Sequence, residues 1–89
     1  MDEPYKTTAI WDENSLPAAI RGSHNTKAGV WGFLRVLEGA VTLVFEDGSA
    51  PVRVTPDRPA LIPPEDKHHV ETDGPMRMQV EFYRERPEI

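Results

Sequence analysis

The stretch VWGFLRVLEGAVTLVFEDGSAPVRVT, residues 30–55, decides the fold class. A Glu-Gly pair at 38–39 and an Asp-Gly pair at 47–48 divide it into three runs rich in apolar and β-branched residues. An Asp-Gly pair between alternating apolar residues is a strong hairpin signal, because tight hairpin turns require a positive φ. The pattern predicts strands over residues 30–37, 40–46 and 52–55.

Short apolar runs continue on the C-terminal side of this stretch. In the last of them Met76, Met78, Val80 and Phe82 alternate with polar residues, which indicates a strand with one buried face. Nine prolines and six glycines interrupt the chain and leave no room for a long helix. Further strands are expected over residues 60–62, 68–72 and 76–84. About seven or eight short strands at this spacing predict an all-β sandwich or barrel.

One short helical turn is expected before the first of these strands, within WDENSLPAAI at residues 11–20. Asp12 or Ser15 would cap it, and Pro17 would lie in its first turn, where a missing N–H has no cost. No other segment shows a convincing helical period.

The composition describes one small domain over residues 1–89, with residues 84–89 expected as a loose tail. The chain has no cysteine, which excludes disulfides and thiolate metal sites. Its net charge is −5 and its ten Lys and Arg are scattered, which argues against nucleic acid as a partner. The apolar runs are far shorter than the ~20 residues that span a bilayer, and no leader is visible, so a cytoplasmic protein is expected.

The candidate site residues are histidines. No P-loop, GxGxxG, GxSxG or HExxH motif occurs, which leaves His24 and the pair His68-His69. Imidazole is the commonest metal ligand once thiolate is excluded, and a barrel can bring these two places together. Glu71 is a candidate carboxylate ligand, although strand alternation would turn it away from His68, and Lys27 is a candidate for holding an anion. The alternative is that all of these are ordinary surface or turn residues.

The order of these signals resembles the cupin family, whose first motif is His-x-His, a Glu and a turn Gly, and whose second is Pro-x-Gly-x-x-His. Gly39 stands at the terminal glycine of the first motif, and PPEDKH at 63–68 follows the second with Glu65 in place of glycine. The first motif is degraded, because Gly32 occupies the glutamate position and only His24 remains near the histidine pair. The resemblance implies a double-stranded β-helix (jelly-roll) barrel without the usual three-histidine, one-glutamate metal set.

Three longer stretches, IWDENSLPAAI, HNTKAGVWGFLRVLEGAVTL and IPPEDKHHVE, look like the small cupin domain found at the N-terminus of some TehB tellurite-resistance proteins. The resemblance runs from about residue 8 to 83 and retains His24, Lys27, His68 and Glu71. In the two-domain proteins a methyltransferase follows and carries the catalysis. This chain has no S-adenosylmethionine-binding glycine loop, so the resemblance implies a fold and a metal or oxyanion site, but no methyltransferase activity.

Three functions are open at this point. The favoured one is a binding module whose barrel mouth holds a divalent metal (zinc, iron, manganese or nickel) or a small anion, with His24, His68 and Glu71 as metal ligands and Lys27 beside the anion. The second is a metal-dependent enzyme acting on a small metabolite or an oxyanion such as tellurite. The third is a metal-free structural or sensing domain. A homodimer is expected, because so small a barrel leaves much strand surface to cover.

Overall fold

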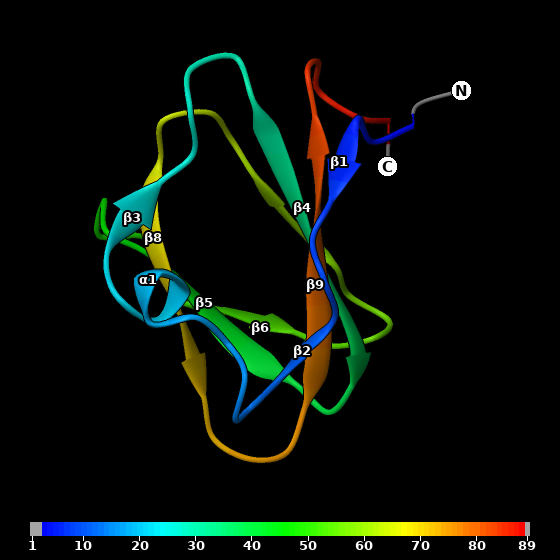
Figure 1. The fold of residues 1–89 in the computed structure, drawn as a ribbon. Coiled ribbons are helices and arrows are strands. Elements are labelled where there is room, and N and C mark those ends of the chain that lie inside the picture. The colour runs from blue at the N-terminus through cyan, green and yellow to red at the C-terminus, as the bar shows by residue number, and fades with distance from the viewer. Residues whose placement is uncertain (1–2, 89) are drawn as a thin grey trace.

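The computed structural model describes residues 3–88, and these residues form two antiparallel sheets and one short helix. The elements are β1 (Lys6–Thr7), β2 (Trp11–Asp12), α1 (Ala18–Arg21), β3 (His24–Asn25), β4 (Trp31–Glu38), β5 (Val41–Phe45), β6 (Val52–Val54), β7 (Ala60–Ile62), β8 (Lys67–Thr72) and β9 (Arg77–Tyr83). One sheet has the order β1-β9-β4-β7, with β2 also paired to β9, and the other has the order β3-β8-β5-β6. Figure 1 shows the two sheets facing one another, with α1 beside β3 and β8.

The expected mostly-β architecture is confirmed, and the strands of the deciding stretch lie where the alternation places them. The consecutive strands β4 and β5 belong to different sheets. The strand β4 pairs with β9 and β7, whereas β5 pairs with β6 and β8. The short strands β1, β2 and β3 were not expected from the sequence. Each contains two residues, which is too short for any alternation to show.

The core lies between the two sheets and consists mainly of the inward side chains of their strands, with Leu16 and Met76 added from the connecting segments. Met76 and Met78, expected as core residues, are 2% and 0% exposed. Each large apolar side chain buried in this way stabilises the fold by roughly 1.5–3 kcal/mol. The other core members are Leu16, Leu34, Val36, Val41, Leu43, Val54, Ala60, Ile62, Val70 and Val80.

A β-bulge interrupts the alternation at the end of β4. In the β4–β9 ladder Val36 pairs with Met78 and Glu38 pairs with Arg77, so Leu37 has no partner of its own. An extra residue of this kind bends the strand and interrupts its in-and-out alternation. Leu37, which is 41% exposed, points outward by ordinary alternation after the buried Val36, and the bulge leaves Glu38 exposed as well.

The helix α1 starts without the side-chain cap that the sequence indicates. The Asp12 carboxylate accepts hydrogen bonds from the backbone N–H groups of Asn14 and Ser15, at 2.8 and 2.9 Å, and so closes a turn instead of capping a helix. The helix α1 begins after Pro17 and has no side-chain cap. The expectation that Asp12 or Ser15 caps this helix is wrong, because the turn at 12–15 uses both side chains first.

The first residues after β9 contact the first sheet, and the loose tail expected over residues 84–89 stays a prediction. Pro87 is buried, and the guanidinium groups of Arg84 and Arg86 lie 4.3 Å and 5.7 Å from the ring centres of Tyr5 and Trp31. Cation–π contacts of this kind contribute roughly 0.5–1 kcal/mol at exposed sites. Residue 89 lies outside the described residues. No helix in the described part of the chain is long and apolar enough to cross a membrane.

The turn between β4 and β5 allows a test of the fold. Gly39 has φ 72° and a Cβ there would lie 2.3 Å from the Pro75 carbonyl oxygen, whereas Gly48 has φ 89° with open space around it. We expect Gly48→Ala to lower the free energy of unfolding by about 1 kcal/mol, through backbone strain alone. Gly39→Ala adds a backbone clash and should cost roughly 2–4 kcal/mol. Urea denaturation measures both, and equal losses would contradict the close approach at Gly39.

Candidate functional site

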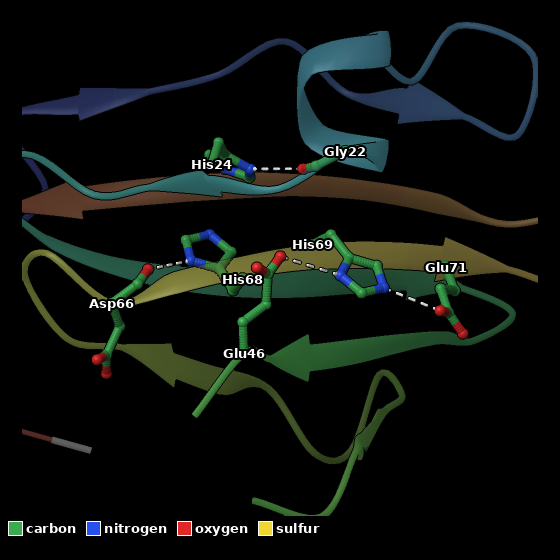
Figure 2. A network of polar contacts seen from close by, with 7 residues as sticks. All are labelled: Gly22, His24, Glu46, Asp66, His68, His69 and Glu71. Carbon is green, nitrogen blue, oxygen red and sulfur yellow. Dashed lines mark hydrogen bonds and ion pairs between the residues drawn. The ribbon is translucent and has the colours of Figure 1, made fainter. Parts of the chain in front are cut away.

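The structure brings His24 and His68 together. The strand β3 pairs with β8 in a register that sets His24 directly opposite His68. Their ring centres are 4.2 Å apart and the ring planes are tilted by 59°. Figure 2 shows the two imidazoles on neighbouring strands. Two residues that are 44 positions apart in the sequence therefore form one polar feature.

Backbone carbonyls orient both rings. The Nδ1 atom of His68 lies 2.6 Å from the Asp66 carbonyl oxygen, and Nδ1 of His24 lies 3.3 Å from that of Gly22 (Figure 2). A carbonyl oxygen only accepts, so Nδ1 carries the hydrogen in each contact. In a neutral ring Nε2 then keeps its lone pair, which is the atom available to a ligand.

A tight turn before β8 fixes the approach to His68. Glu65 has φ 61°, and its N–H donates a 2.9 Å hydrogen bond to the Thr26 carbonyl oxygen. A non-glycine residue in this left-handed region costs roughly 1–2 kcal/mol. The bond joins the turn before β8 to the loop after β3, so that it positions Thr26 near the imidazole pair.

A cavity of about 260 Å³ lies between the two sheets beside these residues. His24, Thr26 and His68, from β3, the loop after it and β8, belong to its polar lining, together with Lys6, Thr8 and Asn25. Apolar side chains from β4, β7 and β9 line the first sheet's side of the cavity, where Gly32 leaves open the space that a larger residue would occupy. Lys27 also lines the cavity and is itself exposed to solvent.

Thr26 is the residue that sequence reasoning missed. It is 7% exposed, and its hydroxyl group has no hydrogen-bond partner among the described residues. A buried polar group without a partner costs roughly 1–3 kcal/mol, so an unpaired hydroxyl in a cavity wall is unusual. The HNTK sequence gives no signal for it, because whether a hydroxyl finds a partner depends on the tertiary structure.

Glu71 does not join the imidazole pair. Its carboxylate accepts a 2.8 Å hydrogen bond from Nε2 of His69, whose Nδ1 lies 3.6 Å from Glu46, and Figure 2 shows His69 between the two carboxylates. Strand alternation turns His69 and Glu71 away from the cavity that His68 lines. Within residues 3–88 no group of three or more His, Asp or Glu side chains is arranged to hold a metal ion.

The two neighbouring histidines have pKa values shifted in opposite directions. Burial lowers the pKa of His68, because desolvation disfavours the imidazolium, and this outweighs the opposing effect of the Asp66 carbonyl. The hydrogen bond to the Glu71 carboxylate raises the pKa of His69. His68 therefore presents an uncharged ring to the cavity at neutral pH.

The unpaired hydroxyl predicts a gain in stability on its removal. Thr26→Val keeps the shape of the side chain and removes the buried oxygen, so we expect the free energy of unfolding to rise by about 1 kcal/mol. Thr8→Val is the matched control, because the Thr8 hydroxyl accepts a 2.9 Å hydrogen bond from the Val80 N–H. It should lose about 1 kcal/mol. Urea denaturation measures both, and a destabilised Thr26→Val protein would mean that the hydroxyl has a partner.

The opposite pKa shifts are measurable by a pH titration of the imidazole NMR signals. We expect His68 to titrate below the ordinary histidine value of about 6.5 and His69 to titrate above it. Glu71→Gln removes the carboxylate acceptor, so it should lower the pKa of His69 and leave that of His68 in place. If His68 titrates above His69, the assignment of the buried and the ion-paired ring is incorrect.

Comparison with known proteins agrees with this architecture. A family model described as TehB-like domain matches residues 6–80. The TehB crystal structure from Haemophilus influenzae superposes with a TM-score of 0.79 at 31% identity, covering 91% of this chain and 30% of that one. The crystal structure of a protein from Escherichia coli (strain K12) gives a TM-score of 0.77 at 27% identity, covering 97% of this chain and 92% of that one.

Two curated relatives from Haemophilus influenzae strains are each named probable S-adenosyl-L-methionine-dependent methyltransferase TehB. They are 43% and 46% identical to this chain over 37 and 35 residues, which are 42% and 39% of its length. The matched part makes up 13% and 12% of those proteins. The resemblance seen in the sequence is confirmed by the family match, which covers most of the chain. This chain belongs to the TehB-like domain family.

Proposed function

We propose that this domain is a small-molecule-binding module, in which the two sheets act as a cupin-type barrel and the ligand enters the cavity between them. The observation that carries the proposal is the pairing of His24 with His68 in the cavity wall. A concave, mostly apolar site with a few convergent polar groups is the usual form of a ligand pocket. Lys27, at the same cavity, adds a positive charge to these groups.

The cavity is large enough for this role. An engineered apolar cavity of about 150 Å³ binds benzene, whereas this one has about 260 Å³. The orienting hydrogen bonds of His68 and His24 hold their rings before any ligand arrives, which lowers the entropic cost of binding. Catalysis would require further groups. A turnover that disappears in both His24→Ala and His68→Ala would favour the alternative of an enzyme acting on a small metabolite or an oxyanion.

A divalent metal, such as zinc, iron, manganese or nickel, is the second candidate ligand, and the adjacent imidazoles are the observation that favours it. Protein metal sites generally have three or four protein ligands, whereas the cavity offers two imidazoles and Glu71 points elsewhere. The described residues therefore fit a metal poorly, and the binding role that we propose does not require one. The homodimer expected from the sequence stays a prediction.

Closing the cavity tests the proposed function. A Cβ at Gly32 would make ordinary contacts with Ile62 and Val80, at 3.4 Å or more, so a larger residue is accommodated at the backbone and its side chain extends along the cavity wall. Gly32→Leu should therefore exclude ligands, while Gly74→Leu, at an open turn position, is the matched control.

The measurement is an NMR shift titration with neutral, anionic and cationic aromatic fragments and with zinc chloride. We expect at least one of these probes to shift the amide signals of Thr26 and Val70 in the wild-type and Gly74→Leu proteins, and no such shift in Gly32→Leu. Should no probe bind, or should Gly32→Leu bind as the wild type does, the cavity is not a ligand site. Urea denaturation of each variant confirms that it is folded.

A further inference from the structure

We infer that the cavity takes a small organic acid, with its carboxylate against Thr26 and Lys27 and its apolar body against the opposite wall. This inference rests on the proposed function and specifies the chemical class of the ligand. Three features of the described residues support it: the charges around the cavity, the unpaired hydroxyl, and the difference between the two walls.

The charges around the cavity are opposite in sign to those of the chain as a whole. The chain contains 15 Asp and Glu against ten Lys and Arg, with a net charge of −5. The cavity is nevertheless lined by two lysines, Lys6 and Lys27, and two histidines, with no Asp or Glu among its described lining residues. Two lysines and no carboxylate among these lining residues favour an anion over a cation in the cavity.

The unpaired hydroxyl supplies a donor at the buried end of the polar wall. Thr26 is buried and its Oγ1 has no partner among residues 3–88, although a hydroxyl can both donate and accept. A carboxylate oxygen is the kind of acceptor that satisfies it, because hydrogen bonds to charged groups are stronger than those between neutral groups. The ammonium group of Lys27 is a second donor at the same cavity.

The opposite wall requires an apolar body on the ligand. Leu34, Ile62, Val80 and Phe82 line the cavity from β4, β7 and β9, and Trp11 of β2 adds an aromatic side chain, so apolar residues prevail on this side although Lys6 and Thr8 also lie there. An inorganic oxyanion such as tellurite or phosphate is hydrated on all sides and has no apolar surface to place against these side chains. A ligand with a ring or a branched chain covers the wall and removes its surface from water, which adds binding free energy.

The experiment compares four probes by NMR shift titration of the full 89-residue chain. Benzoate has both the carboxylate and the apolar ring, benzamide has the same shape without the charge, acetate has the charge without the ring, and tellurite is an inorganic oxyanion. We expect benzoate to bind about tenfold or more tightly than each of the other three, with shifts at Thr26 and Val70, because only benzoate uses both walls.

Two variants separate the charge from the shape. Lys27→Gln should weaken benzoate binding several-fold and leave benzamide binding unchanged, whereas Lys67→Gln, on β8 and outside the cavity lining, should change neither. Thr26→Val should weaken benzoate by about tenfold, the expected loss of one hydrogen bond to a charged group, even though the protein itself becomes more stable.

The outcomes distinguish this inference from the proposed function. If benzamide binds as tightly as benzoate, or tellurite or acetate binds more tightly, the organic-acid inference is overturned while the cavity remains a ligand site. If none of these four probes binds to the wild-type protein, and neither the aromatic fragments nor zinc bind to it, the proposed function itself fails. Benzoate binding that survives Gly32→Leu would place the acid outside the cavity and overturn the inference.

Discussion

The packing of two inward sheet faces against one another is the constraint on which the other features depend. Along β4 and β9 this packing is complete at one end and incomplete at the other. Val36 and Met78, paired across the ladder, are 4% and 0% exposed and belong to the closed core. Gly32 and Phe82, paired four residues away on the same strands, line the cavity. A glycine in the sheet at this point leaves the space that a larger side chain would fill, so core and cavity are two ends of one interface.

Sequence reasoning predicted the parts of this arrangement that have a local pattern. The long strands alternate and end at glycine or proline turns, so their positions followed from the residues themselves. The proximity of His24 and His68 was also predicted, and it depends on a β3 strand of two residues that no local pattern indicates. The outward direction of Glu71 follows from alternation along β8, which conflicts with the ligand role that its spacing from His68 had suggested.

The remaining site features could not be predicted because they are tertiary. Thr26 sits in a polar run that is typical of an exposed turn, yet the fold buries it, and the Glu65 N–H satisfies its carbonyl while nothing described satisfies its hydroxyl. Likewise, the charged residues of the chain are mixed along the sequence, and only folding separates the lysines at the cavity from the carboxylates elsewhere. The unpaired Thr26 hydroxyl thus lowers stability at the place where a bound ligand would supply its hydrogen-bond partner.

The short strands around the cavity also affect how its walls move. Tyr5, Trp11 and His24 lie in or beside β1, β2 and β3, each of which is held by a ladder of two residues, whereas Leu34 and Val80 belong to the long β4–β9 ladder. Segments with few ladder bonds open locally at a small fraction of the global unfolding free energy. We therefore expect the parts of the lining that lie on β1, β2 and β3 to open more often than the parts on the β4–β9 ladder. Local opening at these short strands would enlarge the cavity while the core stays folded.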